Sequence, residues 1–184
     1  MSPLLRGEGL ALIRGGRLLF EGLGVELGSG EGLHVTGPNG SGKSSLIRLV
    51  AGLLDPDAGR IERAPVALAD EALALDRELP LGRALAFWVG ERVRPAVSAF
   101  GLDDLLDVPV RLLSTGQAKR ARLARVMASS APLWLLDEPL NGLDLKGIDE
   151  LDRVIAAHRS AGGAVLAASH VPLGGHWRTL ELEA

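Results

Sequence analysis

Short apolar runs alternate with segments of helical periodicity along this chain. Runs of strand length occur at 32–36, 133–137 and 164–169, and a last short one lies near 179–182. After Lys43, apolar residues recur with helical spacing as far as Leu53, and further helices are predicted at 118–128 and 146–160. Strands that alternate with helices in this way are typical of an α/β fold with a buried parallel sheet.

Two regions depart from this alternation. Near the N-terminus, short strands at 10–13 and 18–20 flank Arg14-Gly15-Gly16, a pattern that predicts a hairpin and an antiparallel edge. Residues from about 78 to 130 are mostly helical in pattern, with breaks at Pro95, Gly101 and Pro109. We therefore expect one domain over 1–184, with a helical subdomain at about 78–130 inserted into the α/β core.

Composition excludes several kinds of chemistry. The chain has 184 residues, of which 47% are hydrophobic, and its net charge of -3 indicates no nucleic-acid partner. It contains no cysteine, which excludes disulfides, thiolate zinc sites and cysteine nucleophiles. No targeting segment is visible, and no apolar run approaches the ~18 residues of a membrane span. We expect a soluble, cytoplasmic protein, for which any membrane association must come through a partner.

Residues 37–44 read Gly-Pro-Asn-Gly-Ser-Gly-Lys-Ser, which matches the phosphate-loop pattern between a strand and a helix. Glycines let the backbone amides face a phosphate, and the helix N-terminus adds partial positive charge. Lys43 would reach the β- and γ-phosphates, and the Ser44 hydroxyl would bind Mg²⁺. The alternative is a glycine turn with a surface lysine, which the strand–loop–helix context disfavours. The candidate phosphate-binding residues are Gly37, Pro38, Asn39, Gly40, Ser41, Gly42, Lys43, Ser44 and Ser45.

The apolar strand at 133–137 ends in two adjacent carboxylates, Asp137 and Glu138. Ligands of open α/β sheets lie beyond the carboxyl ends of such strands. Asp137 is therefore a candidate Mg²⁺ ligand, and Glu138 is a candidate base that polarises an attacking water. The alternative is a strand that simply ends in a polar turn at Pro139.

Leu113-Ser114-Thr115-Gly116-Gln117 resembles the LSGGQ signature of ATP-binding cassette (ABC) proteins, with its first glycine replaced. The same Ser114 and Gln117 form a capping box for the following helix, and both roles can hold together. The resemblance implies that two copies form a homodimer in which Ser114, Thr115, Gly116 and Gln117 contact ATP held by the other copy. It also implies that Asp144, in Asn141-Gly142-Leu143-Asp144, lies in a dimer-contact D-loop, and that His170 is a catalytic switch histidine. A lone histidine is otherwise more often structural.

The chain departs from the family pattern at two positions. Where most members stack adenine on an aromatic residue, this chain has Arg14, whose guanidinium is a candidate substitute. The glutamine that usually links Mg²⁺ to the transporter interface aligns with Glu71. A carboxylate there still accepts water or metal but adds negative charge beside phosphate.

Within the family, the chain most resembles the ATPase subunits of haem exporters in bacterial cytochrome c maturation, especially over 15–23, 131–140 and 169–174. This resemblance implies an ATPase with ATP and Mg²⁺ as cofactors, integral membrane transporter subunits as partners, and haem handled only by partner proteins. Phe87 and Trp88 are candidate contacts to the membrane subunits, although we expect at least one of them to be a core residue of a helix at 83–93. The alternatives are a soluble cassette ATPase, for example in iron–sulfur cluster assembly, or a nucleotide-binding regulatory module with little turnover.

Overall fold

The computed structural model describes residues 3–70, 75–90 and 93–183. An antiparallel sheet has the strand order β2-β1-β4, and a parallel sheet has the order β5-β6-β7-β3-β8. The strands are β1 (Leu5–Arg14), β2 (Arg17–Leu27), β3 (Gly32–Thr36), β4 (Ala58–Arg63), β5 (Val66–Ala69), β6 (Leu133–Asp137), β7 (Ala164–Ala168) and β8 (Arg178–Glu181). The α-helices are α1 (Lys43–Ala51), α2 (Leu81–Val89), α3 (Val93–Ala99), α4 (Thr115–Ala128) and α5 (Leu145–Ser160).

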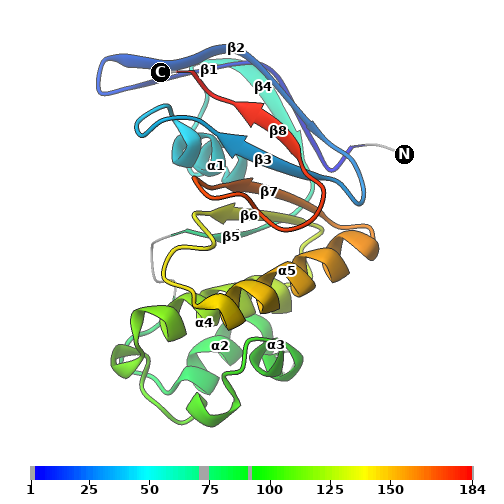
Figure 1. Cartoon of the computed structure of the whole chain (residues 1–184). Helices are drawn as coiled ribbons and strands as arrows, with labels where there is room; N and C mark the ends of the chain where they lie inside the picture. The colour runs from blue at the N-terminus through cyan, green and yellow to red at the C-terminus, as the bar shows by residue number, and fades with distance from the viewer. Residues whose placement is uncertain (1–2, 71–74, 91–92, 184) are drawn as a thin grey trace.

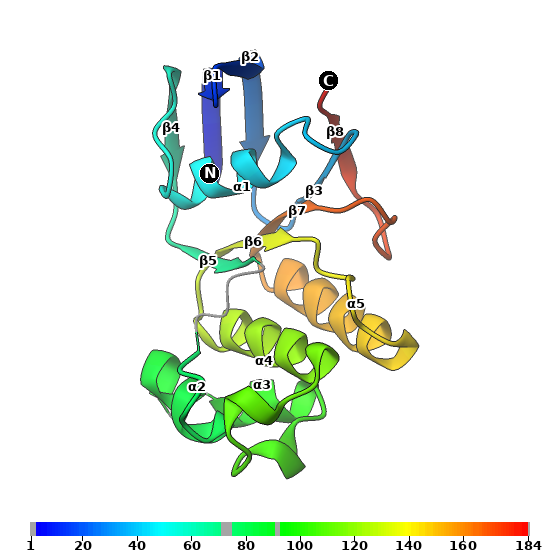
Figure 2. The same ribbon diagram turned by 90° about the vertical axis from the view of Figure 1, so that its left-hand side faces the viewer.

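These elements stack in layers. Helix α1 lies between the two sheets, α4 and α5 cover the opposite face of the parallel sheet, and α2 and α3 pack beyond α4 (Figure 1, Figure 2). The predicted α/β class with an antiparallel edge is therefore confirmed. Helices α2, α3 and α4 follow one another in the chain between β5 and β6, so the helical layer lies within one long connection of the sheet.

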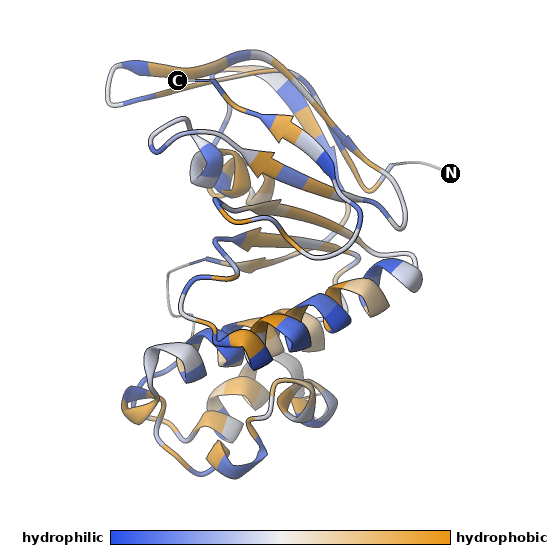
Figure 3. Cartoon of the chain, viewed as in Figure 1, coloured by the Kyte–Doolittle hydropathy of each residue, from blue (hydrophilic) through white to orange (hydrophobic). Residues whose placement is uncertain are grey.

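The parallel strands are buried on both faces. All five residues of β6 are buried, and they alternate between two cores. Leu133 and Leu135 pack on the α1 side, whereas Trp134 and Leu136 pack on the side of the other helices. Figure 3 shows these central strands in apolar colours, while α5 carries both apolar and polar residues along its length. This explains why β6 has a continuous apolar sequence rather than an alternating one.

Several predicted boundaries are wrong. The hairpin strands are 10 and 11 residues long rather than three or four. The first helix ends at Ala51, before Leu53, because Gly52 adopts the left-handed conformation (φ 77°) and caps it. The region predicted as one helix at 83–93 is the end of α2, which stops before Gly90 (φ 60°), followed by the start of α3.

Phe87 and Trp88 are both exposed, at 80% and 50%, so the expectation that one of them is a core residue is wrong. The buried face of α2 consists of Leu81, Ala84 and Leu85. Trp88 would extend that face by one turn, but α2 ends at Val89. Its ring instead packs edge-on against Phe87 and under the Arg125 guanidinium.

The parallel register brings three loops to one edge of the sheet. Asp137 at the end of β6 pairs with Ala168 at the end of β7, and Ala168 also pairs with Val35 near the end of β3. The segments that follow these strands, beginning at Gly37, Glu138 and Ser169, therefore leave the sheet side by side. Among the described residues, no helix has both the length and the apolar character needed to cross a membrane.

Candidate functional site

The loop after β3 has a backbone path that requires glycine. Gly37 has φ 138°, and a Cβ there would collide with the backbone oxygen of Leu182. Gly42 has φ 101° at the N-cap of α1, and a Cβ there would press on Leu19 and Phe20. The loop therefore turns directly into the N-terminus of α1, whose first amides and dipole face the same space.

Lys43 is only 6% exposed and closes the loop from within. Its Nζ donates hydrogen bonds to the backbone oxygens of Gly37 and Pro38, at 2.8 and 3.0 Å. Ser41 is also buried and bonds to Pro38 through the backbone. The side chain of Lys43 thus places a positive charge beside the glycine backbone, where an anion would bind.

A cavity of about 540 Å³ opens over this loop. Its size is that of a typical site for a small organic ligand. The residues that line it come from β2, the phosphate loop, and the loops after β6 and β7: Leu19, Asn39, Gly40, Gly42, Lys43, Ser44, Ser45, Glu138, Asn141 and His170. A cavity that combines a glycine-rich cradle with a carboxylate and an imidazole fits a nucleoside triphosphate.

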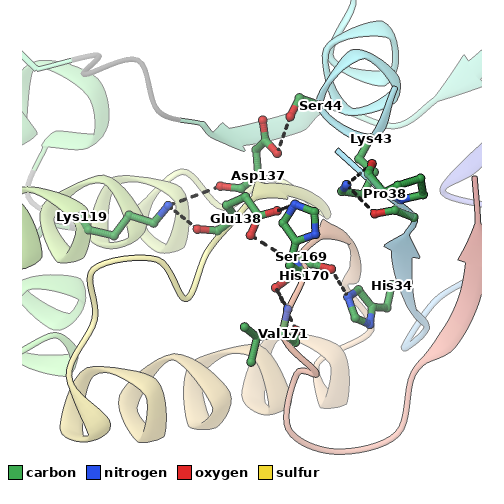
Figure 4. A network of polar contacts seen from close by, with 11 residues as sticks. His34, Pro38, Lys43, Ser44, Lys119, Asp137, Glu138, Ser169, His170 and Val171 are labelled. Carbon is green, nitrogen blue, oxygen red and sulfur yellow. Dashed lines mark hydrogen bonds and ion pairs between the residues drawn. The ribbon is translucent and has the colours of Figure 1, made fainter. Parts of the chain in front are cut away.

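Asp137 lies behind the cavity and contacts it through Ser44, one of the lining residues. The Ser44 hydroxyl donates to Oδ1 of Asp137 at 3.0 Å, as Figure 4 shows, and Asp137 is 4% exposed. Burial raises the pKa of Asp137; the Ser44 hydrogen bond opposes this rise, and the charge of Glu138 adds to it. A hydroxyl and a carboxylate are hard oxygen donors of the kind that Mg²⁺ prefers, so these two residues fit that ion.

Glu138 stands directly after β6 in an unusual backbone conformation, with φ 46°. Its carboxylate oxygens lie 3.3 Å from Nε2 of His170 and 3.4 Å from the His170 backbone nitrogen. Figure 4 shows the imidazole beside this carboxylate, between β6 and β7. The structure thus brings both candidate catalytic residues, Glu138 and His170, to the cavity that contains Lys43 and Ser44.

The candidate signature residues lie outside this cavity, at the N-terminus of α4. Ser114 caps α4 by accepting a hydrogen bond from the Gln117 backbone, and Gln117 accepts one from Ser114, so the predicted capping box is confirmed. Ser114, Gly116 and Gln117 line a second hollow of about 290 Å³ together with Asp144 and its neighbours. Asp144 itself caps α5, accepting from the Gly147 backbone at 2.8 Å. Thr115 begins α4, and its methyl group lies near Gly142 of the same segment.

The two residues at which the chain departs from the family pattern, Arg14 and Glu71, are not placed in the cavity. Arg14 is exposed in the hairpin turn and is not among the residues that line the cavity. Glu71 lies outside the described residues. Sequence reasoning missed Leu19, whose apolar side chain lines the cavity, and Arg17, whose guanidinium approaches Gly40. Both follow the hairpin turn, where only Arg14 carried an expectation.

Comparisons with known proteins agree with this geometry. The profile of the ABC transporter family matches residues 20–141. The chain is 56% identical to the cytochrome c biogenesis ATP-binding export protein CcmA of Sphingopyxis alaskensis, over 94% of this chain and 93% of that protein. It is 51% identical to the protein of the same name from Zymomonas mobilis, over 95% and 82%.

Solved structures show the same fold. An ABC transporter ATP-binding protein from Pyrococcus furiosus superposes with a TM-score of 0.85 and 20% identity, covering 98% of each chain. The ATP-binding subunit of another ABC transporter superposes with a TM-score of 0.82 and 24% identity, covering 91% of this chain and 80% of that one.

Proposed function

The chain belongs to the ABC transporter family, and we propose that it is the ATP-binding, ATP-hydrolysing subunit of an export complex for cytochrome c biogenesis. The observation that carries the proposal is the single cavity that joins Lys43 and Ser44 to Glu138 and His170. The shared name of the relatives favours this function over a soluble cassette ATPase of iron–sulfur cluster assembly.

The residues of the cavity supply the parts that phosphoryl transfer to water requires. The loop amides and Lys43 stabilise charge on the phosphates, and Glu138 accepts the proton of the water that attacks the γ-phosphorus. His170 orients the Glu138 carboxylate through their 3.3 Å contact. Ser44 and Asp137 would hold Mg²⁺, which would supply positive charge against the phosphates. The products are ADP and phosphate, with the proton first on the Glu138 carboxylate.

Two copies complete each site in this proposal. Among the described residues, those that line the hollow around Ser114 differ from those that line the phosphate cavity, which supports two separate phosphate-binding surfaces on one chain. A helix N-terminus whose capping serine hydroxyl can still donate its proton binds anions well. ATP would then lie between the loop of one copy and the Ser114 helix of the other, hold the dimer together, and release it on hydrolysis.

We assign the membrane-spanning part of the complex and the handling of its cargo to partner proteins. ABC ATP-binding subunits work with membrane transporter components, and the exposed Phe87–Trp88 pair on α2 is the surface we assign to that contact. Haem is the proposed cargo, and it is assigned to the partners because this chain has no cysteine and its four histidines are scattered along the sequence without a haem-binding motif. The subunit would thus sit on the inner face of the membrane through its partners.

Steady-state phosphate release by the chain, purified with its membrane partners, tests the proposal. Glu138→Gln should lower kcat by about a hundredfold or more while ATP binding persists, because the water loses its base but the cradle is intact. Lys43→Ala should instead raise the Kd for ATP. Hydrolysis at the wild-type rate in Glu138→Gln would show that another group is the base.

A further inference from the structure

Lys119 is a buried cation in the signature helix α4 that none of the roles above uses. It is 3% exposed, and its Nζ donates to the backbone oxygen of Glu138 at 2.7 Å and to that of Asp137 at 3.3 Å. Figure 4 shows the side chain reaching from α4 to the end of β6, on the side away from the phosphate loop. Both acceptors belong to the two residues that carry the candidate metal ligand and base.

The backbone at this point needs support. Glu138 has φ 46°, a left-handed conformation that residues with a Cβ rarely adopt and that persists only where its surroundings enforce it. Its N–H donates to Ala168 at 2.8 Å, and its backbone oxygen accepts from Lys119 and from the Asn141 N–H at 3.2 Å. Of these two hydrogen bonds to the Glu138 backbone oxygen, the one from Lys119 is the shorter and is donated by a charged group.

Lys119 also connects the Glu138 backbone to the signature residues at the N-terminus of α4. It lies about one helical turn beyond Ser114, which caps the same helix. A rigid α4 that shifts when phosphate binds at its N-terminus must move the Lys119 ammonium with it. Because that ammonium is bonded to the Glu138 backbone, the shift changes where the carboxylate points.

We infer that Lys119 is a positioning residue, which fixes the direction of the Glu138 carboxylate and makes it depend on the position of α4. This inference rests on the proposed function, in which Glu138 is the base and Ser114 meets the ATP of the second copy. Misplacement of a reacting group by about 1 Å can lower a rate about a hundredfold. Removing the ammonium should therefore act on turnover and not on nucleotide binding.

Lys119→Met tests this inference in the chain purified with its membrane partners, with Arg153→Met, an exposed cation on α5, as the matched control. Lys119→Met should lower kcat at least tenfold, change the KM for ATP less than twofold, and have little further effect on the residual rate of Glu138→Gln. Lys119→Arg should restore most of the activity because it again places a cation at the two oxygens. A kcat equal to that of Arg153→Met, or a KM that rises as kcat falls, overturns the inference.

Hydrogen exchange gives a readout that does not depend on turnover. In Lys119→Met, the amides of residues 138–143 should exchange faster than in the wild type, whereas those of α1 should be unchanged; unchanged exchange at 138–143 overturns the inference. If thermal melting shows that Lys119→Met does not fold, Lys119→Gln takes its place under the same criteria. Failure of the wild-type complex to hydrolyse ATP would overturn the proposed function instead, and hydrogen exchange would still decide the role of Lys119.

Discussion

At the scale of single residues, the burial of His158 makes the stability of the folded protein depend on pH. Its ring stacks on Trp134, with centroids 3.8 Å apart and planes 8° from parallel. Burial lowers the pKa of His158, and backbone hydrogen bonds with Ala164 and Pro132 only partly oppose this. Below an unfolded-state pKa of about 6.5, the unfolded chain binds a proton that the folded chain resists, so stability falls as the pH falls.

His158→Gln should therefore reduce the loss of Tm between pH 7.5 and pH 5.5, because the glutamine does not titrate. At pH 7.5 the same variant should be less stable than the wild type by about 1 kcal/mol, the value of a stacked aromatic pair. Thermal melting at the two pH values measures both effects. His176→Gln, at an exposed histidine, should keep the wild-type pH dependence. An unchanged acid-dependent loss in His158→Gln would exclude His158 as its source.

Residues with local sequence signals could be predicted, and those with distant partners could not. Lys43, Ser44, Asp137 and Glu138 were found because each belongs to a short pattern next to an apolar strand, and the structure places all four together. Lys119 carried no such signal. Its acceptors lie 18 and 19 positions away, so its contact depends on how the chain turns between α4 and β6.

At the scale of elements, the sequence indicates most clearly the strands that are buried on both faces. The apolar runs of β6 and β7 marked these strands to within one residue. Strand β4 was missed because its six residues are exposed or half-buried, so its sequence has no regular alternation of apolar and polar residues. Antiparallel pairing with β1 holds it in place through backbone hydrogen bonds, which the side-chain pattern does not reveal.

Ser114, the N-cap of helix α4, has both a structural role and a proposed binding role. Ser114→Ala removes the N-cap and should lower the free energy of unfolding by about 1 kcal/mol. Ser114→Asp should keep the stability, because aspartate caps helices as well as serine. In a Glu138→Gln background, however, it should abolish ATP-driven dimerisation by repelling the γ-phosphate of the other copy. Size-exclusion chromatography with ATP measures the dimer, and dimerisation of the aspartate variant would contradict the signature role.

At the scale of the whole molecule, the proposed partner surface is tied to the central sheet. Arg125 lies 5.1 Å from the centre of the Trp88 ring and donates to the backbone oxygen of Leu68 in β5 at 2.6 Å. One turn earlier on α4, Arg122 donates to the backbone oxygen of Asp70 at 2.8 Å. A subunit that docks on the aromatic pair would therefore contact a helix that carries Ser114 at one end and is bonded to the sheet along its length.

Phe87→Ser tests that surface without disturbing the core. Phe87 is 80% exposed, so the substitution should change the free energy of unfolding by no more than about 0.5 kcal/mol. It should nevertheless weaken association with the membrane subunits, because a large exposed aromatic is the kind of residue that anchors an interface. Leu53→Ser, at an exposed apolar residue after α1, is the matched control and should leave association unchanged. Affinity purification from detergent-solubilised membranes measures the effect as a ratio of partner to ATPase subunit. Equal ratios for Phe87→Ser and the wild type would place the membrane contact on another face of the molecule.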